Sequence, residues 1–255
     1  MRGFGMDPFG HDSQFTADDH FFHRTFLSDE RADDDAAEIL GLLDLPSGAR
    51  ILDAGCGDGR IAVRLAAAGL EVTGVDHDAK QLDRARTAAS TRGVALSLVE
   101  SSLEAFDGRH HFDGAIAWFN TLGFLDDAAN TAVLQGLRRS VLDGAPLVIE
   151  TLNRDAVARH HAVAPEAVVV EREGAMQIDQ SRLDSVAGRL LTTRTVVRGS
   201  VTRRRILSLR VMAPSEWVTV LRGAGFEVED VSGRTGVPLD VDEWEMVITA
   251  RAALS

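Results

Sequence analysis

Short apolar runs alternate with amphipathic stretches along most of this chain. The apolar runs are predicted strands and lie at residues 50–53, 72–75, 94–99, 115–119, 146–152, 226–231 and 245–250. The stretches with helical spacing lie at residues 33–43, 61–68, 79–91, 131–141 and 214–221. Strands that alternate with helices in this way are typical of an α/β fold with a mostly parallel sheet.

Residues 156–213 break the alternation. Four short runs rich in β-forming residues follow one another there, separated by turn-like pairs such as Glu173-Gly174 and Ala187-Gly188. This pattern predicts an antiparallel meander inserted after the fifth strand. The segment is also basic, with ten arginines against five acids, or about +5, whereas the remainder carries about −17. Such a contrast indicates a segment that faces something different from the rest.

The first 30 residues are expected to form a tail and one helix. Residues 1–14 show no periodicity and indicate a mobile tail. Phe15, Phe22 and Phe26 then fall near one helical face. The helix is interpreted either as packed on the core or as a lid over a ligand. The predicted organisation is a tail and lid helix at 1–30, an α/β core at 31–155, the insertion at 156–213 and the completion of the core at 214–255.

Composition narrows the class of protein. The net charge of −12 over 255 residues argues against a nucleic-acid-binding surface spread over the whole protein. No apolar run approaches the roughly 20 residues of a membrane span, and no signal peptide is evident, so we expect a cytoplasmic protein with no membrane partner. The single cysteine, Cys56, excludes a disulfide framework and a cysteine-based zinc site.

Candidate chemistry begins at the turn after the first strand, which reads Asp53-x-Gly55-x-Gly57-x-Gly59. Glycines at every second position let a ligand lie against main-chain N–H groups. Asp76, at the end of the second strand, stands where a ribose diol would be held. The spacing differs from the G-x-G-x-x-G of dinucleotide folds, and the charge of Asp53 would repel a pyrophosphate but attract an ammonium group. The pattern predicts a positively charged nucleoside ligand; a tight connection without a ligand is the structural alternative.

At these residues the chain resembles the class I S-adenosylmethionine-dependent methyltransferases, in particular those acting on small molecules. The resemblance covers about residues 20–250 and implies a Rossmann-like seven-stranded sheet of order 3-2-1-4-5-7-6, with strand 7 antiparallel and helices on both faces. It implies S-adenosyl-L-methionine as the cofactor. The implied cofactor-binding residues are Asp53, Ala54, Gly55, Cys56, Gly57, Gly59, Asp76, His77, Ser102, Leu103, Trp118 and Phe119. Ser101 stands where many members have an aspartate for the adenine, and Trp118 could equally be core.

Acceptor residues are expected where strands 4 and 5 end, because ligands of open α/β sheets bind beyond the carboxyl ends of the strands. The substrate candidates are Asn120, Asn153, Arg154, Arg203 and Arg205. The two arginines of the insertion either select an acceptor that carries carboxylate or phosphate, or pair with acids of the body or of a second subunit. If the acceptor is a hydroxyl, the candidate bases are His160, His161 and Glu150, although methyl transfer can proceed without a dedicated base. No metal site is expected.

Three other functions stay open at this point. They are an adenosylmethionine-binding module without catalysis, an RNA methyltransferase and an NAD-dependent oxidoreductase. The acidic balance disfavours the second, and the glycine spacing disfavours the third. The preferred interpretation is a methyltransferase for a small-molecule acceptor, with O-, N- and C-methylation unresolved and a homodimer among the open oligomeric states.

Overall fold

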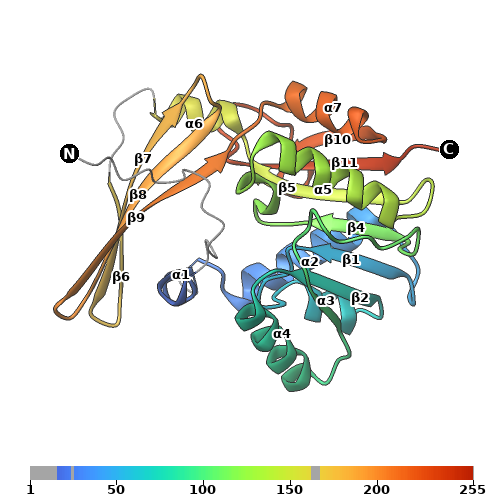
Figure 1. Cartoon of the computed structure of the whole chain (residues 1–255), viewed down its shortest axis with the longest axis horizontal. Coiled ribbons are helices and arrows are strands. Elements are labelled where there is room, and N and C mark those ends of the chain that lie inside the picture. Colours follow the sequence, from blue (N-terminus) through green and yellow to red (C-terminus); the bar gives the residue numbers. More distant parts are fainter. Residues whose placement is uncertain (1–15, 24–25, 162–166, 255) are drawn as a thin grey trace.

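The computed structural model describes residues 16–23, 26–161 and 167–254. A seven-stranded sheet forms the body of the protein, in the order β10-β11-β5-β4-β1-β2-β3 (Figure 1). Its strands are β1 (Arg50–Ala54), β2 (Glu71–Asp76), β3 (Ser97–Glu100), β4 (Gly114–Ala117), β5 (Pro146–Leu152), β10 (Phe226–Gly233) and β11 (Glu245–Ala252). Strand β11 runs antiparallel to both β5 and β10. The expected strand order and its one reversed strand are confirmed.

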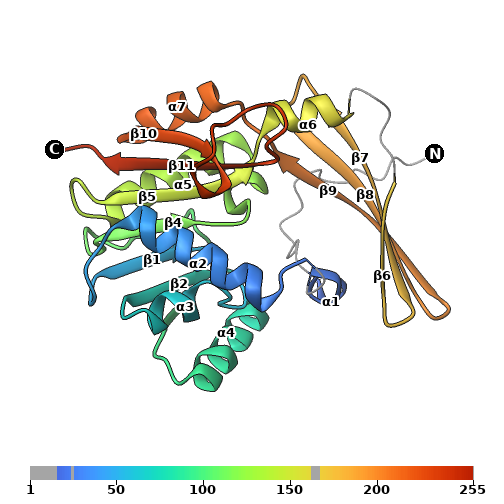
Figure 2. The same cartoon turned by 180° about the vertical axis from the view of Figure 1, so that it is seen from behind.

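Helices cover both faces of this sheet because successive side chains of a strand point to opposite faces. Ile51 packs with α2 (Asp29–Leu43) and α3 (Ala62–Ala67), which lie in front of the sheet in Figure 2. Leu52 packs with α5 (Asp127–Ser140) and α7 (Pro214–Gly223) on the other face. Helix α4 (Ala79–Arg92) packs beside α3, and the short 3-10 turns η1 (Thr121–Gly123) and η2 (Arg234–Gly236) complete the body.

The insertion forms a second, four-stranded antiparallel sheet, as predicted. After α6 (Arg154–His161) its strands follow in chain order as β6 (Val168–Arg172), β7 (Ala175–Asp184), β8 (Arg189–Arg198) and β9 (Val201–Arg210). The long strands β7, β8 and β9 are each ten residues, well beyond the short runs seen in the sequence. Pairing between neighbouring strands of the hairpins extends β7, β8 and β9 beyond the apolar positions of the sequence pattern.

The short helix α1 (Ala17–His23) lies between this second sheet and the body in both views (Figures 1 and 2). Phe22 is fully buried against Val170, Ala175 and Val196 of the second sheet. The expected phenylalanine face is only partly correct. Phe26 lies beyond the end of the helix with 52% of its surface exposed, and Phe15 lies outside the described residues.

Several predicted boundaries move by a few residues. Helix α2 begins at Asp29 because the Ser28 hydroxyl accepts a hydrogen bond from the Arg31 N–H, so the expected boundary at 30 falls inside a helix. The boundary at 155 falls inside α6. Strand β3 begins at Ser97 rather than at residue 94, and β4 ends at Ala117, since the backbone turns into the left-handed region two residues later. Within the described ranges, no helix is long and apolar enough to cross a membrane.

Candidate functional site

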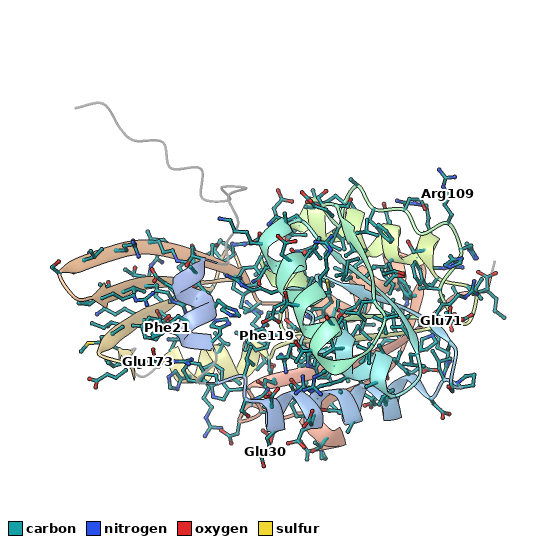
Figure 3. The ribbon with its side chains drawn as sticks, turned by 90° about the horizontal axis from the view of Figure 1, so that it is seen from below. Phe21, Glu30, Glu71, Arg109, Phe119 and Glu173 are labelled. Carbon is teal, nitrogen blue, oxygen red and sulfur yellow. The ribbon has the colours of Figure 1, made fainter. Side chains whose placement is uncertain are left out.

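A cavity of about 1210 Å³ opens at the carboxyl ends of β1, β2 and β4. Helix α1 forms one of its walls, and Figure 3 shows Phe21 of α1 toward the second sheet and Phe119 of the body toward α1. The volume exceeds the ~300–1,000 Å³ of typical single-ligand pockets. The cavity therefore has room for two small molecules side by side.

The glycine turn forms the floor of this cavity. Gly55 and Gly57 both have positive φ, +75° and +55°. A Cβ on Gly55 would meet the Thr121 side chain at 2.5 Å, whereas a Cβ on Gly57 would meet nothing within 4 Å. Gly55 is thus required by packing, and Gly57 leaves open space on the cavity side for a ligand to approach the backbone.

Asp53 lies at the same floor, with only 3% of its surface exposed. Its Oδ2 atom is buried and accepts no hydrogen bond from any residue that the structure describes. Burial, and then the charge of Asp76, raise the pKa of this carboxyl to about 7. A buried carboxylate without a partner is costly, and a cationic group would relieve that cost. The residues therefore fit a ligand with an ammonium group at this point.

Asp76 is held by two backbone N–H donors. Gly57 N donates to its Oδ2 and Asp78 N donates to its Oδ1, each at 2.9 Å. A carboxylate accepts about four hydrogen bonds, so this fixed group can still accept from a diol in the cavity that it lines. The position predicted for ribose recognition lies where such a contact can form.

Most of the other predicted cofactor residues line the cavity: Cys56, His77, Ser102, Leu103, Trp118 and Phe119. Gly59 does not; a Cβ there would lie 2.9 Å from Ala85 of α4, so it serves close packing. Ala54 is completely buried and lies behind the floor. Burial raises the pKa of the Cys56 thiol, which makes this cysteine a poor nucleophile. Ser101 directs its hydroxyl to the Ser102 carbonyl, and Glu104 lines the cavity nearby.

The far end of the cavity carries two histidines from α1 that sequence reasoning missed. His20 and His23 both line it, together with Leu27, Phe119 and Phe124. The His23 ring meets the Phe119 ring edge-on at 5.8 Å, and His20 Nδ1 lies 3.7 Å from an Asp58 oxygen. Burial, and then the charge of Arg194, lower the pKa of His23 to about 4, so its imidazole is neutral at physiological pH. The three-residue spacing of the histidines places them on one helical face, which was the available signal.

The three polar candidates after strands 4 and 5 do not reach the cavity. Asn120 accepts hydrogen bonds from Leu152 N and Thr151 Oγ1. Asn153 is 1% exposed and donates to the carbonyls of Asp240 and Glu243. Arg154 points to Glu216 and to the Ser185 carbonyl instead. Each of these side chains ties together segments that are distant in the sequence, and their assignment to substrate stays a prediction that the cavity lining does not favour.

The candidate bases also lie elsewhere. His160 and His161 end α6, where the His160 ring packs against Trp244 at 5.0 Å. Glu150 is 1% exposed and does not line the cavity; its Oε2 accepts a 2.6 Å hydrogen bond from Phe119 N. None of the three lines the cavity. No cluster of metal-ligating side chains occurs in the part of the chain that the structure describes.

Arg203 and Arg205 are occupied by acids of α1. Arg203 Nη1 lies 2.9 Å from Asp18, and Arg205 pairs with Asp19, which also receives Arg194 at 2.5 Å. Neither Arg203 nor Arg205 lines the cavity. Of the two interpretations of these arginines, the structure favours pairing with acids, here acids of the same chain, and their use for an anionic acceptor stays an untested prediction.

Comparison with known proteins gives a consistent result. Residues 51–144 match a family model described as a methyltransferase domain. A ubiquinone biosynthesis O-methyltransferase from Pectobacterium carotovorum is 33% identical over 117 residues, 46% of this chain and 48% of that protein. A second, from Xanthomonas axonopodis, is 28% identical over 190 residues, 74% of this chain and 66% of that protein. The chain spans about half the length of the first curated relatives it matches.

Solved structures share the fold over nearly the whole chain. The CcbJ methyltransferase from Streptomyces caelestis has a TM-score of 0.75 at 24% identity, covering 88% of this chain and 90% of that one. CalS10, an amino pentose methyltransferase from Micromonospora echinaspora with S-adenosylmethionine bound, has a TM-score of 0.65 at 20% identity, covering 96% and 100%. With its sheet order, its glycine turn and its two acids, the chain has the fold of these methyltransferases, and its residues 51–144 match a methyltransferase domain.

Proposed function

We propose that this protein transfers a methyl group from S-adenosylmethionine to a small-molecule acceptor that binds between α1 and the glycine turn. The observation that carries the proposal is the buried Asp53 carboxylate, whose Oδ2 has no partner at the floor of a cavity large enough for a cofactor and an acceptor. A structural acid would have its partner within the chain. This one fits a partner that arrives with the ligand.

The chain's own residues account for each end of the cofactor. Asp53 would hold the methionine ammonium, and Asp76, already fixed by Gly57 and Asp78, would hold the ribose hydroxyls. Ser102 and Leu103 would lie along the adenine. When bound, S-adenosylmethionine supplies an electrophilic methyl group on a sulfonium. Alignment of the acceptor and exclusion of water are then what the protein must provide.

The end of the cavity that His20, His23 and Phe119 line, which we call the acceptor end, is suited to those two tasks. Helix α1 forms one wall there and would shield the acceptor from water, and the apolar residues that line the cavity include Phe119, Phe124 and Leu27. His23 lines this end of the cavity with a neutral imidazole, because burial lowers its pKa to about 4. The names of the relatives, an O-methyltransferase and an amino pentose methyltransferase, agree with an acceptor that carries a hydroxyl or an amine. A cytoplasmic location and a homodimer stay predictions.

Titration calorimetry with adenosylhomocysteine tests the proposal, with NAD as the competing ligand. Wild type should bind adenosylhomocysteine, and Asp76→Ala should bind it more weakly by about 1.5–3 kcal/mol, the range of a hydrogen bond to a charged group. Glu229→Gln, an exposed acid paired with Arg251, is the matched control and should change nothing. Unchanged affinity in both Asp53→Asn and Asp76→Ala would overturn the site.

Turnover separates an enzyme from a module that only binds. Wild type and His23→Ala are incubated with labelled S-adenosylmethionine and a panel of small hydroxyl and amine compounds. Label should move to at least one compound, and His23→Ala should impair that transfer without weakening adenosylhomocysteine binding. Binding without transfer to any compound of the panel would favour the silent module.

A further inference from the structure

The wall of the acceptor end contains an unusual backbone turn. Phe119 and Asn120 are successive residues with positive φ, 62° and 60°. Side chains with a Cβ disfavour this left-handed region, and two such residues in a row persist only where the surroundings hold them. Continued in the register of Ala117 with Ile149, the strand would set Phe119 opposite Thr151 within the sheet. The turn takes Phe119 out of that path.

Four hydrogen bonds between the turn and β5 hold it in place, among them one at 3.3 Å that Thr151 Oγ1 donates to Asn120 Oδ1. Glu150 Oε2 accepts from Phe119 N at 2.6 Å, and the Glu150 carbonyl accepts from Asn120 N at 3.1 Å. On the other side, Asn120 Oδ1 accepts from Leu152 N at 2.8 Å. Glu150 thus contacts the turn through its side chain and its main chain. Its carboxylate supplies the bond to the first left-handed residue.

The turn determines where the Phe119 ring lies. The ring lines the cavity, 5.8 Å from the His23 ring, with the Arg60 guanidinium 5.9 Å from its centre. His23 is half-buried where it lines the cavity, and the Phe119 ring covers part of its imidazole. The position of one ring therefore shapes the acceptor wall and the surroundings of His23.

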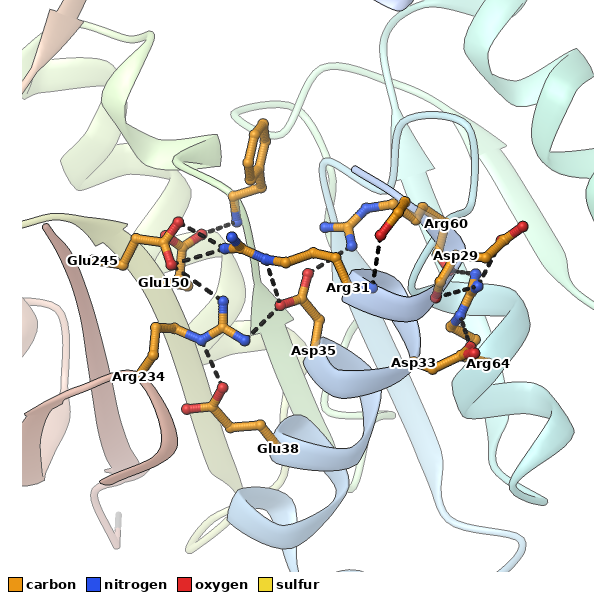
Figure 4. A network of polar contacts seen from close by, with 12 residues as sticks. Asp29, Arg31, Asp33, Asp35, Glu38, Arg60, Arg64, Glu150, Arg234 and Glu245 are labelled. Atoms are coloured by element: carbon orange, nitrogen blue, oxygen red, sulfur yellow. Dashed lines mark hydrogen bonds and ion pairs between the residues drawn. The ribbon is translucent and has the colours of Figure 1, made fainter. Parts of the chain in front are cut away.

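A carboxyl group is energetically unfavourable at the buried position that Glu150 occupies behind the turn. Glu150 is 1% exposed, and its second oxygen, Oε1, has no hydrogen-bond partner among residues 16–23, 26–161 and 167–254. Arg31 and Arg234 lie close by, but both guanidinium groups are bonded to Glu245 and Asp35 (Figure 4). Burial raises the pKa of the Glu150 carboxyl to about 8, so near neutral pH it is mostly protonated, and its Oε2 accepts from Phe119 N as an amide oxygen in the same place would.

We propose that Glu150 is a positioning residue, which holds the left-handed Phe119–Asn120 turn so that the Phe119 ring forms the acceptor wall against His23. The role rests on the proposed function, because it acts on the acceptor end of that site. It differs from that of a base, since Glu150 itself does not reach the cavity.

The test reads the His23 imidazole by NMR titration, which needs neither cofactor nor acceptor. Three variants are compared: Glu150→Gln keeps an oxygen acceptor, Glu150→Met keeps the volume without one, and Glu229→Met is an exposed control. In wild type, Glu150→Gln and Glu229→Met, the pKa of His23 should stay near 4. In Glu150→Met the Phe119 ring should withdraw, and the pKa should rise toward the ordinary value of 6.5 as His23 is exposed. Amide exchange at Phe119 should accelerate at least tenfold in the same variant.

Each result decides the proposal. Unchanged His23 titration and Phe119 exchange in Glu150→Met would overturn it, as would Glu150→Gln behaving like Glu150→Met. If Glu150→Met does not fold, Glu150→Ala replaces it, because the smaller side chain leaves space for water on the Phe119 N–H. Once an acceptor is known, its KM should rise at least tenfold in Glu150→Met, with the affinity for adenosylhomocysteine within twofold of wild type. Loss of kcat in Glu150→Gln at unchanged KM would point to a base instead. Failure of methyl transfer in wild type would leave the NMR result intact and so concern only the proposed function.

Discussion

Cofactor binding should depend on pH through Asp53, and the structure gives the size of the effect. In the free protein the pKa of this carboxyl is about 7, raised first by burial and then by Asp76. A ligand ammonium beside Oδ2 stabilises the charged form, so the bound state requires ionised Asp53. The perturbation is a change from pH 7.5 to pH 5.5, over which the ligand's own ammonium stays protonated.

The magnitude follows from the ionised fraction. With a pKa of about 7, roughly three quarters of the free protein is ionised at pH 7.5 and ~3% at pH 5.5. The affinity for adenosylhomocysteine should therefore fall by about 25-fold, or ~1.9 kcal/mol at 1.36 kcal/mol per unit. Asp53→Asn cannot ionise and should bind at pH 7.5 at least that much more weakly than wild type, with little further change on acidification.

Titration calorimetry in two buffers of different ionisation enthalpy measures both quantities. Near one proton should be released per ligand bound at pH 5.5 and about a quarter of a proton at pH 7.5. His20 and His77 also line the cavity, so His20→Gln and His77→Gln serve as controls. Affinity that is flat with pH in wild type, or a pH dependence retained in Asp53→Asn, would refute the assignment of the ammonium site.

Three further predictions concern stability and packing. Burial raises the pKa of Glu150 to about 8 from an ordinary 4.5, so the folded protein keeps a proton that the unfolded chain releases, and stability should fall as pH rises from about 4.5 to 8. In thermal unfolding at pH 9, Glu150→Gln should therefore melt at a higher temperature than wild type. Equal melting temperatures would contradict this prediction. Asp19 is 1% exposed between Arg194 and Arg205, so Asp19→Asn should lower the free energy of unfolding by ~3 kcal/mol and reduce amide-exchange protection at residues 17–23. Asp18→Asn, whose arginine partners are exposed, should lower it by under ~1 kcal/mol. Equal effects of the two variants would reject the buried pairing as the anchor of α1. Gly57→Ala should weaken adenosylhomocysteine binding more than Gly59→Ala does, which calorimetry measures. Gly59→Ala should lower Tm more than Gly57→Ala does, because its Cβ meets Ala85, and thermal unfolding measures this difference.

The sequence alone could predict those features that depend on residues close together along the chain. The apolar runs predicted all but the details of both sheets, because strand pattern and burial follow from side-chain alternation within a few residues. Asp53, the glycines and Asp76 were found for the same reason: the turn after β1 and the end of β2 are each contiguous, and parallel strands bring their carboxyl ends together. The order of the strands came with the family resemblance and is confirmed.

Contacts between distant segments decided the rest. Asn120, Asn153 and Arg154 follow strands at the expected edge, yet their partners lie up to 90 residues away, and no spacing reveals those bonds. The partner of Arg203 is Asp18, 185 residues earlier, so the basic insertion was readable as a charge contrast but its purpose was not.

The acceptor end depends on such contacts most of all. His20 and His23 reach the cavity only because the second sheet folds back to hold α1 through Phe22 and the arginine pairs. Phe119 was named from its place after strand 4, but its direction was set by Glu150 and Asn120 across β5. A helix of seven residues has too little local stability to specify its own place, so tertiary packing alone determined where these side chains lie.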